Sequence, residues 1–271
     1  MNRAQLYSSA NALQTRDAAA ALSLYCDVMS WPEECFVLDV GCGSGDVTSK
    51  LLLPALKRCS TVTAVDVSPS MVKFAASKHQ HPNLNFRCLD IVAPDLRPRA
   101  IFPTGFHKIF SFYCLHWISN QRQAFSNMFD LLLPGGELLV VFLASNPIFT
   151  VYERLSQDSN WSRYMKDASK FVSPYQHSDR PDDDLRDHLD MSGFTIKDCN
   201  CLLQHFAFPS VNALKSAIKA VNPFIDRIPK EMHEDYLNDC IDEFNDMGCV
   251  NDDGTVSADY RLLVAFAKKS K

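Results

Sequence analysis

The sequence predicts an α/β protein built on a doubly wound, mostly parallel sheet of seven strands. First, short apolar, β-branched segments alternate with helix-like segments between residues 35 and 145, a rhythm typical of parallel sheets with right-handed crossovers. Second, a glycine-rich turn directly follows the first strand-like segment. Third, a late pair of strand-like segments predicts an antiparallel hairpin at one edge of the sheet.

The alternating elements can be placed in order along the chain. Two helices are expected within residues 1–30. Strands are then expected over residues 36–40, 61–67, 84–88, 108–115 and 137–144, and helices over 46–58, 69–78 and 121–132. Ser68 and Pro69 are typical of a helix start, because serine caps free backbone N–H groups and proline suits the first turn. Prolines within residues 94–104 predict a loop.

After residue 144 the alternation breaks down. A helix is expected over 182–191, the long and the last strands over 194–208 and 260–267, and two helices within 210–248. We expect one domain over residues 1–271, with helical cap elements at about 1–30, 145–180 and 210–248. These cap elements are expected above the carboxyl ends of the strands, where open α/β sheets bind ligands.

Composition excludes several classes of protein. The chain has 271 residues, is 46% hydrophobic and 22% charged, and carries a net charge of −5 without a basic run, which argues against nucleic acid as a partner. No signal peptide or membrane-length apolar run is visible, so we expect a cytoplasmic protein without integral membrane association. The ten cysteines have no CxxC spacing, which predicts reduced thiols and no metal site. A monomer and a homodimer remain equally open.

The turn after the first strand is the most informative segment. Asp39 is followed by Gly41, Gly43, Gly45 and Asp46. Backbone that approaches a ligand closely, or takes a positive φ, benefits from the missing Cβ atoms. Dinucleotide folds space the third glycine more widely, and a P-loop needs a Gly-Lys-Ser/Thr sequence that is absent here. The flanking acids disfavour a pyrophosphate and favour a cationic cofactor such as S-adenosylmethionine.

Two further acids follow the next two strands. Asp66, with Val67 after it, ends the second strand and can accept hydrogen bonds from both hydroxyls of a ribose. Asp90 ends the third strand and can accept from an adenine amino group, while Ile91 packs on the ring. A single aspartate at a strand end is more often a turn residue, but Asp39, Asp66 and Asp90 at three consecutive strand ends favour a cofactor site.

The segments DVGCGSG, VDVS, LD and LPGG occur in this order between residues 35 and 145. This series resembles the motifs of the class I S-adenosylmethionine-dependent methyltransferases. The resemblance implies a Rossmann-like seven-stranded sheet, S-adenosylmethionine as cofactor and S-adenosylhomocysteine as product. A non-catalytic cofactor-binding protein of the same fold and, less favoured by the glycine spacing, a dehydrogenase remain alternatives.

Two shorter segments point to the methyl acceptor. Residues 4–17 and the sequence Cys114-Leu115-His116-Trp117 resemble the juvenile hormone acid O-methyltransferases. That resemblance implies esterification of a sesquiterpenoid acid, farnesoic acid or juvenile hormone acid, with Gln14 and Trp117 holding its carboxylate. We expect His116 to belong to the cofactor pocket. Without the resemblance, Gln14 suits an exposed helix position and Trp117 an ordinary core position.

The chemistry of a carboxylic acid gives this hypothesis an independent rationale. An acid with a pKa of about 4 is already ionised at neutral pH, so in-line methyl transfer requires no general base. No convincing Cys/His or Ser/His arrangement supplies one. Neutral donors, such as the Gln14 amide and the Trp117 indole, can orient the carboxylate without an ion pair.

The predicted cap is rich in aromatic side chains, which suits a lipophilic acid. We expect Tyr7, Phe149, Tyr152 and Phe224 to line the substrate pocket, although an ordinary small core would need the same residue types. Another small carboxylic acid, including a polyacid, remains an alternative. A polyacid would need basic residues in the pocket, and the lysines and arginines of the cap resemble solvated helix faces.

Overall fold

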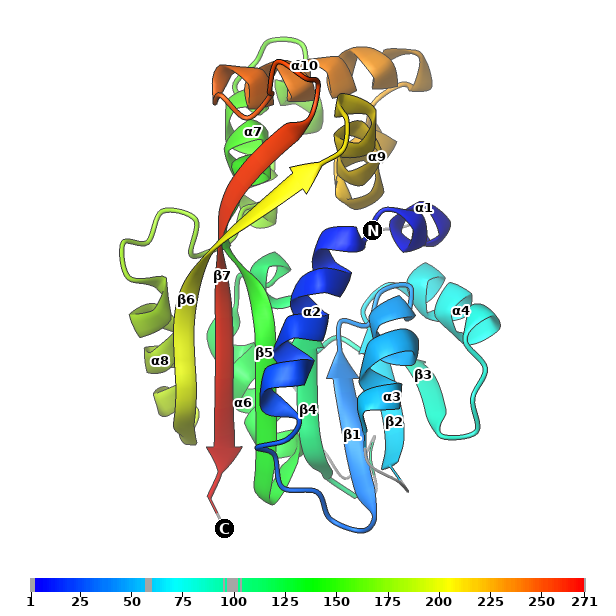
Figure 1. Cartoon of the computed structure of the whole chain (residues 1–271), viewed down its shortest axis with the longest axis vertical. Helices are drawn as coiled ribbons and strands as arrows, with labels where there is room; N and C mark the ends of the chain where they lie inside the picture. The colour runs from blue at the N-terminus through cyan, green and yellow to red at the C-terminus, as the bar shows by residue number, and fades with distance from the viewer. Residues whose placement is uncertain (1–2, 57–59, 95, 97–101, 103, 271) are drawn as a thin grey trace.

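The computed structural model describes residues 3–56, 60–94, 96, 102 and 104–270. Its sheet has the strand order β3-β2-β1-β4-β5-β7-β6 (Figure 1). The strands are β1 (Cys35–Val40), β2 (Ser60–Asp66), β3 (Leu84–Cys88), β4 (Phe106–Phe112), β5 (Leu132–Ser145), β6 (Phe194–Phe208) and β7 (Val256–Lys269). The first five pair in parallel, and β7 runs antiparallel to both β5 and β6. The predicted fold, including the C-terminal hairpin, is therefore confirmed.

The helices follow the predicted order, with one difference after the glycine-rich turn. They are α1 (Ala4–Ser9), α2 (Ala12–Tyr25), α3 (Leu53–Ala55), α4 (Pro69–Lys78), α6 (Gln121–Leu131), α7 (Pro147–Leu155), α8 (Pro181–Met191), α9 (Val211–Val221) and α10 (His233–Asp246). The helix predicted over 46–58 is a π-helical turn, Thr48–Leu52, followed by α3, and residues 57–59 lie outside the described part. The expected loop over 94–104 is described only at residues 94, 96, 102 and 104.

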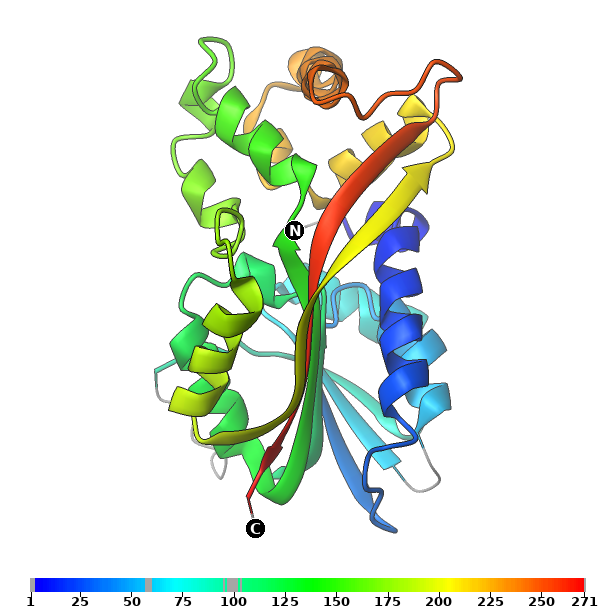
Figure 2. The same cartoon turned by 60° about the vertical axis from the view of Figure 1, so that its left-hand side comes forward.

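The central strands of the sheet are buried on both faces. Along β5, Leu139, Val141 and Leu143 belong to one hydrophobic cluster together with residues of α2. Their neighbours Leu138, Val140 and Phe142 belong to the other, together with residues of α6 and α8. Alternate side chains of a strand point to opposite faces, so a continuous apolar strand needs helices on both sides. Figure 2 shows α2 on one side of the sheet and α6 and α8 on the other.

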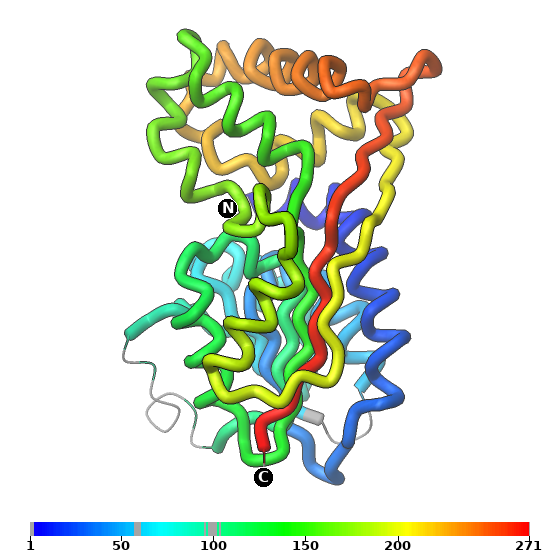
Figure 3. Tube along the Cα trace, turned by 90° about the vertical axis from the view of Figure 1, so that its left-hand side faces the viewer, coloured from blue at the N-terminus to red at the C-terminus, as the bar shows by residue number. Residues whose placement is uncertain are grey.

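A helical cap lies beyond the carboxyl ends of the parallel strands. Helices α7, α9 and α10 form it, and β6 and β7 run side by side past the rest of the sheet to reach it (Figures 1 and 3). Our prediction placed all of residues 1–30 in the cap, and this is wrong for α2. That helix packs along the sheet against β5, because its residues Ala18, Ala21 and Leu22 are buried there.

Neither a membrane span nor a metal cluster is found within the described ranges. No helix there combines the length and the hydropathy needed to cross a bilayer. No group of three His, Cys, Asp or Glu side chains there is arranged to hold a metal ion.

A buried ion pair joins the strands near the amino end of β5. Lys108 on β4 and Glu137 on β5 are register partners, are 2% and 0% exposed, and place Nζ 2.6 Å from Oε2. Lys268 on β7 pairs with the other oxygen at 2.5 Å. The backbone N–H of Ser30 donates to Glu137 Oε2 at 3.0 Å. The Glu137 carboxylate therefore connects three strands and the segment after α2.

Replacing Lys108 by methionine should strongly destabilise the protein. Removal of one partner of a buried ion pair leaves an uncompensated charge and costs about 3–5 kcal/mol. Urea unfolding of Lys108→Met measures this loss. Lys268→Met is the matched control, because Lys268 is 32% exposed and water can replace a partly exposed partner. An equal loss in both variants would contradict the role assigned to Lys108.

Candidate active site

Two close approaches explain the glycines of the loop after β1. Gly41 has φ +81°, and a Cβ there would lie 2.3 Å from the Cβ and Sγ atoms of Cys114. Gly45 has φ +78°, and its Cβ would lie 2.9 Å from Phe86 and 3.0 Å from Ala75. A side chain at either position would displace the segment after β4 or the packing of α4 on β3.

A pocket lies beside this loop, and we call it the glycine-loop pocket. Six residues predicted to bind the cofactor line it: Gly41, Gly43, Asp66, Val67, Asp90 and Ile91. The backbone N–H groups of Gly43 and Ser68 donate to Asp66 Oδ2 and Oδ1, each at 2.9 Å. The N–H of Val92 donates to Asp90 Oδ1 at 3.0 Å. Both carboxylates are therefore held in place by the backbone.

Asp39 and Gly45, although predicted as cofactor residues, do not line this pocket. Asp39 is 2% exposed, and Thr48 Oγ1 donates to its Oδ2 at 2.5 Å. Burial raises the pKa of Asp39 to about 7, against the opposing effect of the Thr48 hydrogen bond. The hydrogen bond from Thr48 therefore joins Asp39 at the end of β1 to the π-helical turn that follows the loop.

Asp46 does not present its charge to the pocket either. Its Oδ1 lies 2.7 Å from Lys50 Nζ and 3.3 Å from Lys78 Nζ, and Ser44 donates to Oδ2 at 2.7 Å. Burial opposes ionisation, but hydrogen bonds from Lys50 and Ser44 lower the pKa of Asp46 to about 2. The interpretation that both flanking acids face a cationic cofactor is therefore wrong for both. Asp39 is buried away from the glycine-loop pocket, and Asp46 is paired with two lysines.

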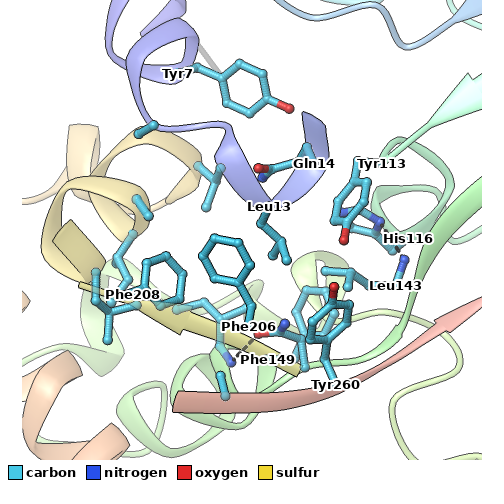
Figure 4. A pocket seen from close by; sticks show the side chains of 18 of the residues that line it. Tyr7, Leu13, Gln14, Tyr113, His116, Leu143, Phe149, Phe206, Phe208 and Tyr260 are labelled. Atoms are coloured by element: carbon cyan, nitrogen blue, oxygen red, sulfur yellow. Dashed lines mark hydrogen bonds between the residues drawn. The ribbon is translucent and has the colours of Figure 1, made fainter. Parts of the chain in front are cut away.

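A second pocket lies under the cap, and we call it the cap pocket (Figure 4). Its walls come from α2, from the 3₁₀ turn Leu115–Trp117, and from α7, β6, α9 and β7. Four residues line both pockets: Tyr7, Tyr113, Trp117 and Val221. The two pockets therefore meet at these side chains.

The polar residues predicted to hold a carboxylate both line the cap pocket. The Oε1 atom of Gln14 is buried and has no hydrogen-bond partner among the described residues. Trp117 is half-buried, and its ring packs edge-to-face on Phe149 with centroids 6.0 Å apart. A buried polar atom without a partner is costly, so this amide is available to a ligand. Because the unpartnered atom is an acceptor, the amide has to flip and present its Nε2 group in order to donate to a carboxylate.

His116 lies in the cap pocket and does not line the glycine-loop pocket, where we expected it. It is 3% exposed, and the backbone N–H of Leu143 donates to its Nδ1 at 3.3 Å. Burial lowers the pKa of His116 to about 3. The ring is therefore neutral at physiological pH, with its proton on Nε2.

The predicted lining aromatics divide between pocket and core. Tyr7 and Phe149 line the cap pocket. Tyr152 and Phe224 do not; both are fully buried and pack edge-to-face on each other with centroids 5.2 Å apart.

Several lining residues escaped the sequence analysis. Tyr113, directly after β4, and Tyr260, near the start of β7, line the cap pocket. Helix α9 contributes Leu214 and Ile218. Their i, i+4 spacing is visible in the sequence and identifies a buried face, but it does not show what that face covers.

The glycine-loop pocket fits S-adenosylmethionine. Each oxygen of the Asp66 carboxylate accepts one backbone hydrogen bond and keeps a lone pair for a ribose hydroxyl. Asp90 and Ile91 line the same pocket and would hold the adenine ring.

Comparison with known proteins agrees with this fit. Residues 37–136 match the family model described as a methyltransferase domain. A putative methyltransferase from Bacillus halodurans has a TM-score of 0.58 at 18% identity, over 93% of this chain and 100% of that one. Phosphoethanolamine N-methyltransferase 2 of Haemonchus contortus, solved with S-adenosyl-L-methionine, has a TM-score of 0.52 at 14% identity, over 93% of this chain and 52% of that one. The fold and site define a class I S-adenosylmethionine-dependent methyltransferase.

Relatives of similar length give the particular family. The juvenile hormone acid O-methyltransferase of Drosophila melanogaster is 36% identical, over 100% of this chain and 93% of that protein. That of Bombyx mori is 35% identical, over 99% and 98%. The chain belongs to the juvenile hormone acid O-methyltransferase family and is an S-adenosylmethionine-dependent O-methyltransferase.

Substitution of Asp66 by alanine should weaken binding of S-adenosylhomocysteine. The loss of hydrogen bonds to a charged acceptor costs about 1.5–3 kcal/mol each, so we expect the Kd to rise by at least about tenfold. Calorimetric titration measures it. The control is Asp252→Ala, an exposed carboxylate that lines neither pocket. Unchanged affinity in Asp66→Ala would contradict the ribose role.

Proposed function

We propose that the protein esterifies the carboxylate of a lipophilic sesquiterpenoid acid, farnesoic acid or juvenile hormone acid. One observation carries the proposal. The cap pocket is largely apolar but contains neutral amide, imidazole and indole groups from Gln14, His116 and Trp117. It meets the glycine-loop pocket at Trp117. The names of the Drosophila and Bombyx relatives support the same substrate class.

The reaction needs positioning more than acid–base chemistry. A carboxylic acid is ionised at neutral pH and is its own nucleophile. S-adenosylmethionine supplies the electrophilic methyl group when it is bound. The residues of the chain have to align the carboxylate with that group and exclude water. His116 cannot act as a cation, since burial lowers its pKa to about 3.

The pocket lining favours a lipophilic acid over a polyacid. No lysine or arginine is among the described residues that line the cap pocket. A small polyacid would need such cations to offset the loss of hydration of its additional charges. Aromatic and aliphatic side chains from Phe206, Phe208 and Leu214 instead match a long hydrocarbon chain.

Helix α1 closes the junction of the two pockets. Tyr7 lines both of them. The helix is tied to α4 by a hydrogen bond from Lys78 Nζ to Ser8 Oγ. It is tied to α9 by Arg3, whose guanidinium donates to the Lys219 carbonyl at 2.9 Å. This arrangement supports exclusion of water from the place where carboxylate and methyl group meet.

Gln14→Ala and Trp117→Phe should each lower kcat/KM for the acid by at least about tenfold, the order of one hydrogen bond to a charged group. Steady-state kinetics with a radiolabelled methyl donor measures this. The affinity of Gln14→Ala for S-adenosylhomocysteine should not change, because Gln14 does not line the glycine-loop pocket. Gln157→Ala, an exposed glutamine of the cap, is the control. Normal ester formation by both variants would remove the carboxylate role.

A panel of acids tests the substrate class. We expect methyl esters from farnesoic acid and juvenile hormone acid, and a kcat/KM at least about a hundredfold lower with short-chain acids, since each buried CH₂ contributes about 0.8 kcal/mol of binding energy. Aconitate and citrate represent the polyacid alternative. If they are methylated and farnesoic acid is not, the proposal is wrong. A comparison of farnesoic acid with juvenile hormone acid shows whether the epoxide is needed.

A further inference from the structure

A buried carboxylate that lines neither pocket lies behind the cap pocket. Asp17 is on α2, three residues after Gln14, and is 5% exposed. Its Oδ2 accepts hydrogen bonds from the hydroxyls of Tyr113 and Tyr260, each at 2.5 Å. Its Oδ1 accepts from Arg16 Nε at 2.9 Å. One carboxylate thus joins α2 to the segment after β4 and to β7.

Both tyrosine rings bonded to Asp17 line the cap pocket (Figure 4). Tyr113 also has a backbone φ of +55°, the left-handed region that non-glycine residues rarely adopt. Such strain persists only where the surroundings hold it, and it is concentrated at functional sites. Tyr113 begins the segment that carries His116 and Trp117, so the bond to Asp17 restrains this segment relative to α2.

The charge of Asp17 is balanced by Arg16, which does not line the cap pocket. Besides its bond to Asp17, Arg16 donates to the His205 carbonyl at 2.7 Å and to the Tyr260 hydroxyl. Its guanidinium lies over the ring of Phe206, 5.1 Å from the centroid. Arg16 does not line the cap pocket, so the network places no cation beside a bound acid.

The two tyrosines cannot take the role of donor or base while Asp17 holds them. A phenol has one proton, and in both tyrosines it is given to Asp17. Burial, followed by the charge of Asp17, raises the pKa of Tyr113. The donors left to a substrate carboxylate are then those of the other polar side chains that line the cap pocket: Gln14, His116, Trp117, Tyr7 and Asn146.

We propose that Asp17 is a positioning residue of this site: it fixes the Gln14 amide on α2 relative to the Trp117 indole after β4. The inference deepens the proposed function and rests on it. Stability alone gives little reason for the group, because buried ionic networks can often be replaced by apolar residues without loss. A carboxylate shared by two tyrosines does what an apolar core would not, since directional hydrogen bonds fix the relative orientation of three elements.

Asp17→Asn tests this inference in the full-length protein. An asparagine keeps the shape but has one acceptor oxygen, and its NH₂ group would face a hydroxyl donor or the Arg16 guanidinium. With farnesoic acid we expect kcat to fall by at least about tenfold. The Kd for S-adenosylhomocysteine should stay within about twofold, because Asp17 does not line the glycine-loop pocket.

The chain offers a matched control on the same helix. Tyr25 of α2 donates its hydroxyl to Asp198 of β6, and neither residue lines either pocket. Asp198→Asn therefore weakens another aspartate–tyrosine bond of α2. We expect it to lower the melting temperature and leave kcat unchanged. If both variants lose activity in proportion to their loss of melting temperature, Asp17 is only structural and the inference is wrong.

A double-substitution cycle shows whether Asp17 acts through Gln14. If it does, Asp17→Asn should cost much less in a Gln14→Ala background than in the wild type. Additive losses would overturn the inference, as would wild-type kcat in Asp17→Asn. In either case, esterification of farnesoic acid by the wild type leaves the proposed function intact. A wild type that methylates no lipophilic acid contradicts the proposed function and, with it, this inference.

Discussion

The close contact between the glycine loop and the segment after β4 is the constraint on which both pockets depend. Because a Cβ on Gly41 would overlap Cys114, these two strand ends can approach only with glycine at position 41. The approach carries Tyr113 and Trp117 to the border of the glycine-loop pocket, and the same residues line the cap pocket. The glycine-loop pocket and the cap pocket are therefore adjacent because two neighbouring parallel strands end together.

The parts predicted from sequence are those set by local chemistry. The alternation predicted the succession of strands and helices along the chain. A residue at or just after a strand end, such as Asp66 or Asp90, has its place set by that strand. His116 was misplaced because the residues of a 3₁₀ turn point in different directions, and the Leu143 N–H that fixes the ring comes from another strand. Tyr152 and Phe224 were indistinguishable from Phe149 because packing between separate segments decides which ring reaches the pocket.

The charges around the glycine loop show a similar limit. The sequence predicts Asp46 as part of a negatively charged cofactor site, yet its carboxylate is held by Lys50 and Lys78. Lys50 was visible at the i, i+4 position, whereas Lys78 comes from α4 and is known only from the fold. The effect of a charged side chain on a site cannot be predicted until its partners in the fold are known. The same holds for Arg16, which pairs with Asp17 and does not line the cap pocket.

The described lining of the cap pocket contains no lysine or arginine, and this suits the proposed nucleophile, a carboxylate that is already ionised. An anionic oxygen that pairs with a lysine or arginine is stabilised most before the reaction, when its charge is greatest, and such binding raises affinity without raising turnover. In this protein Asp17 and backbone oxygen hold the guanidinium of Arg16, and burial keeps His116 neutral. The pocket can then orient a carboxylate through neutral donors and leave its charge available to the methyl group. The proposed substrate, an acid with one carboxylate and a long apolar chain, suits this balance, since its chain supplies by burial the affinity that an ion pair would otherwise provide.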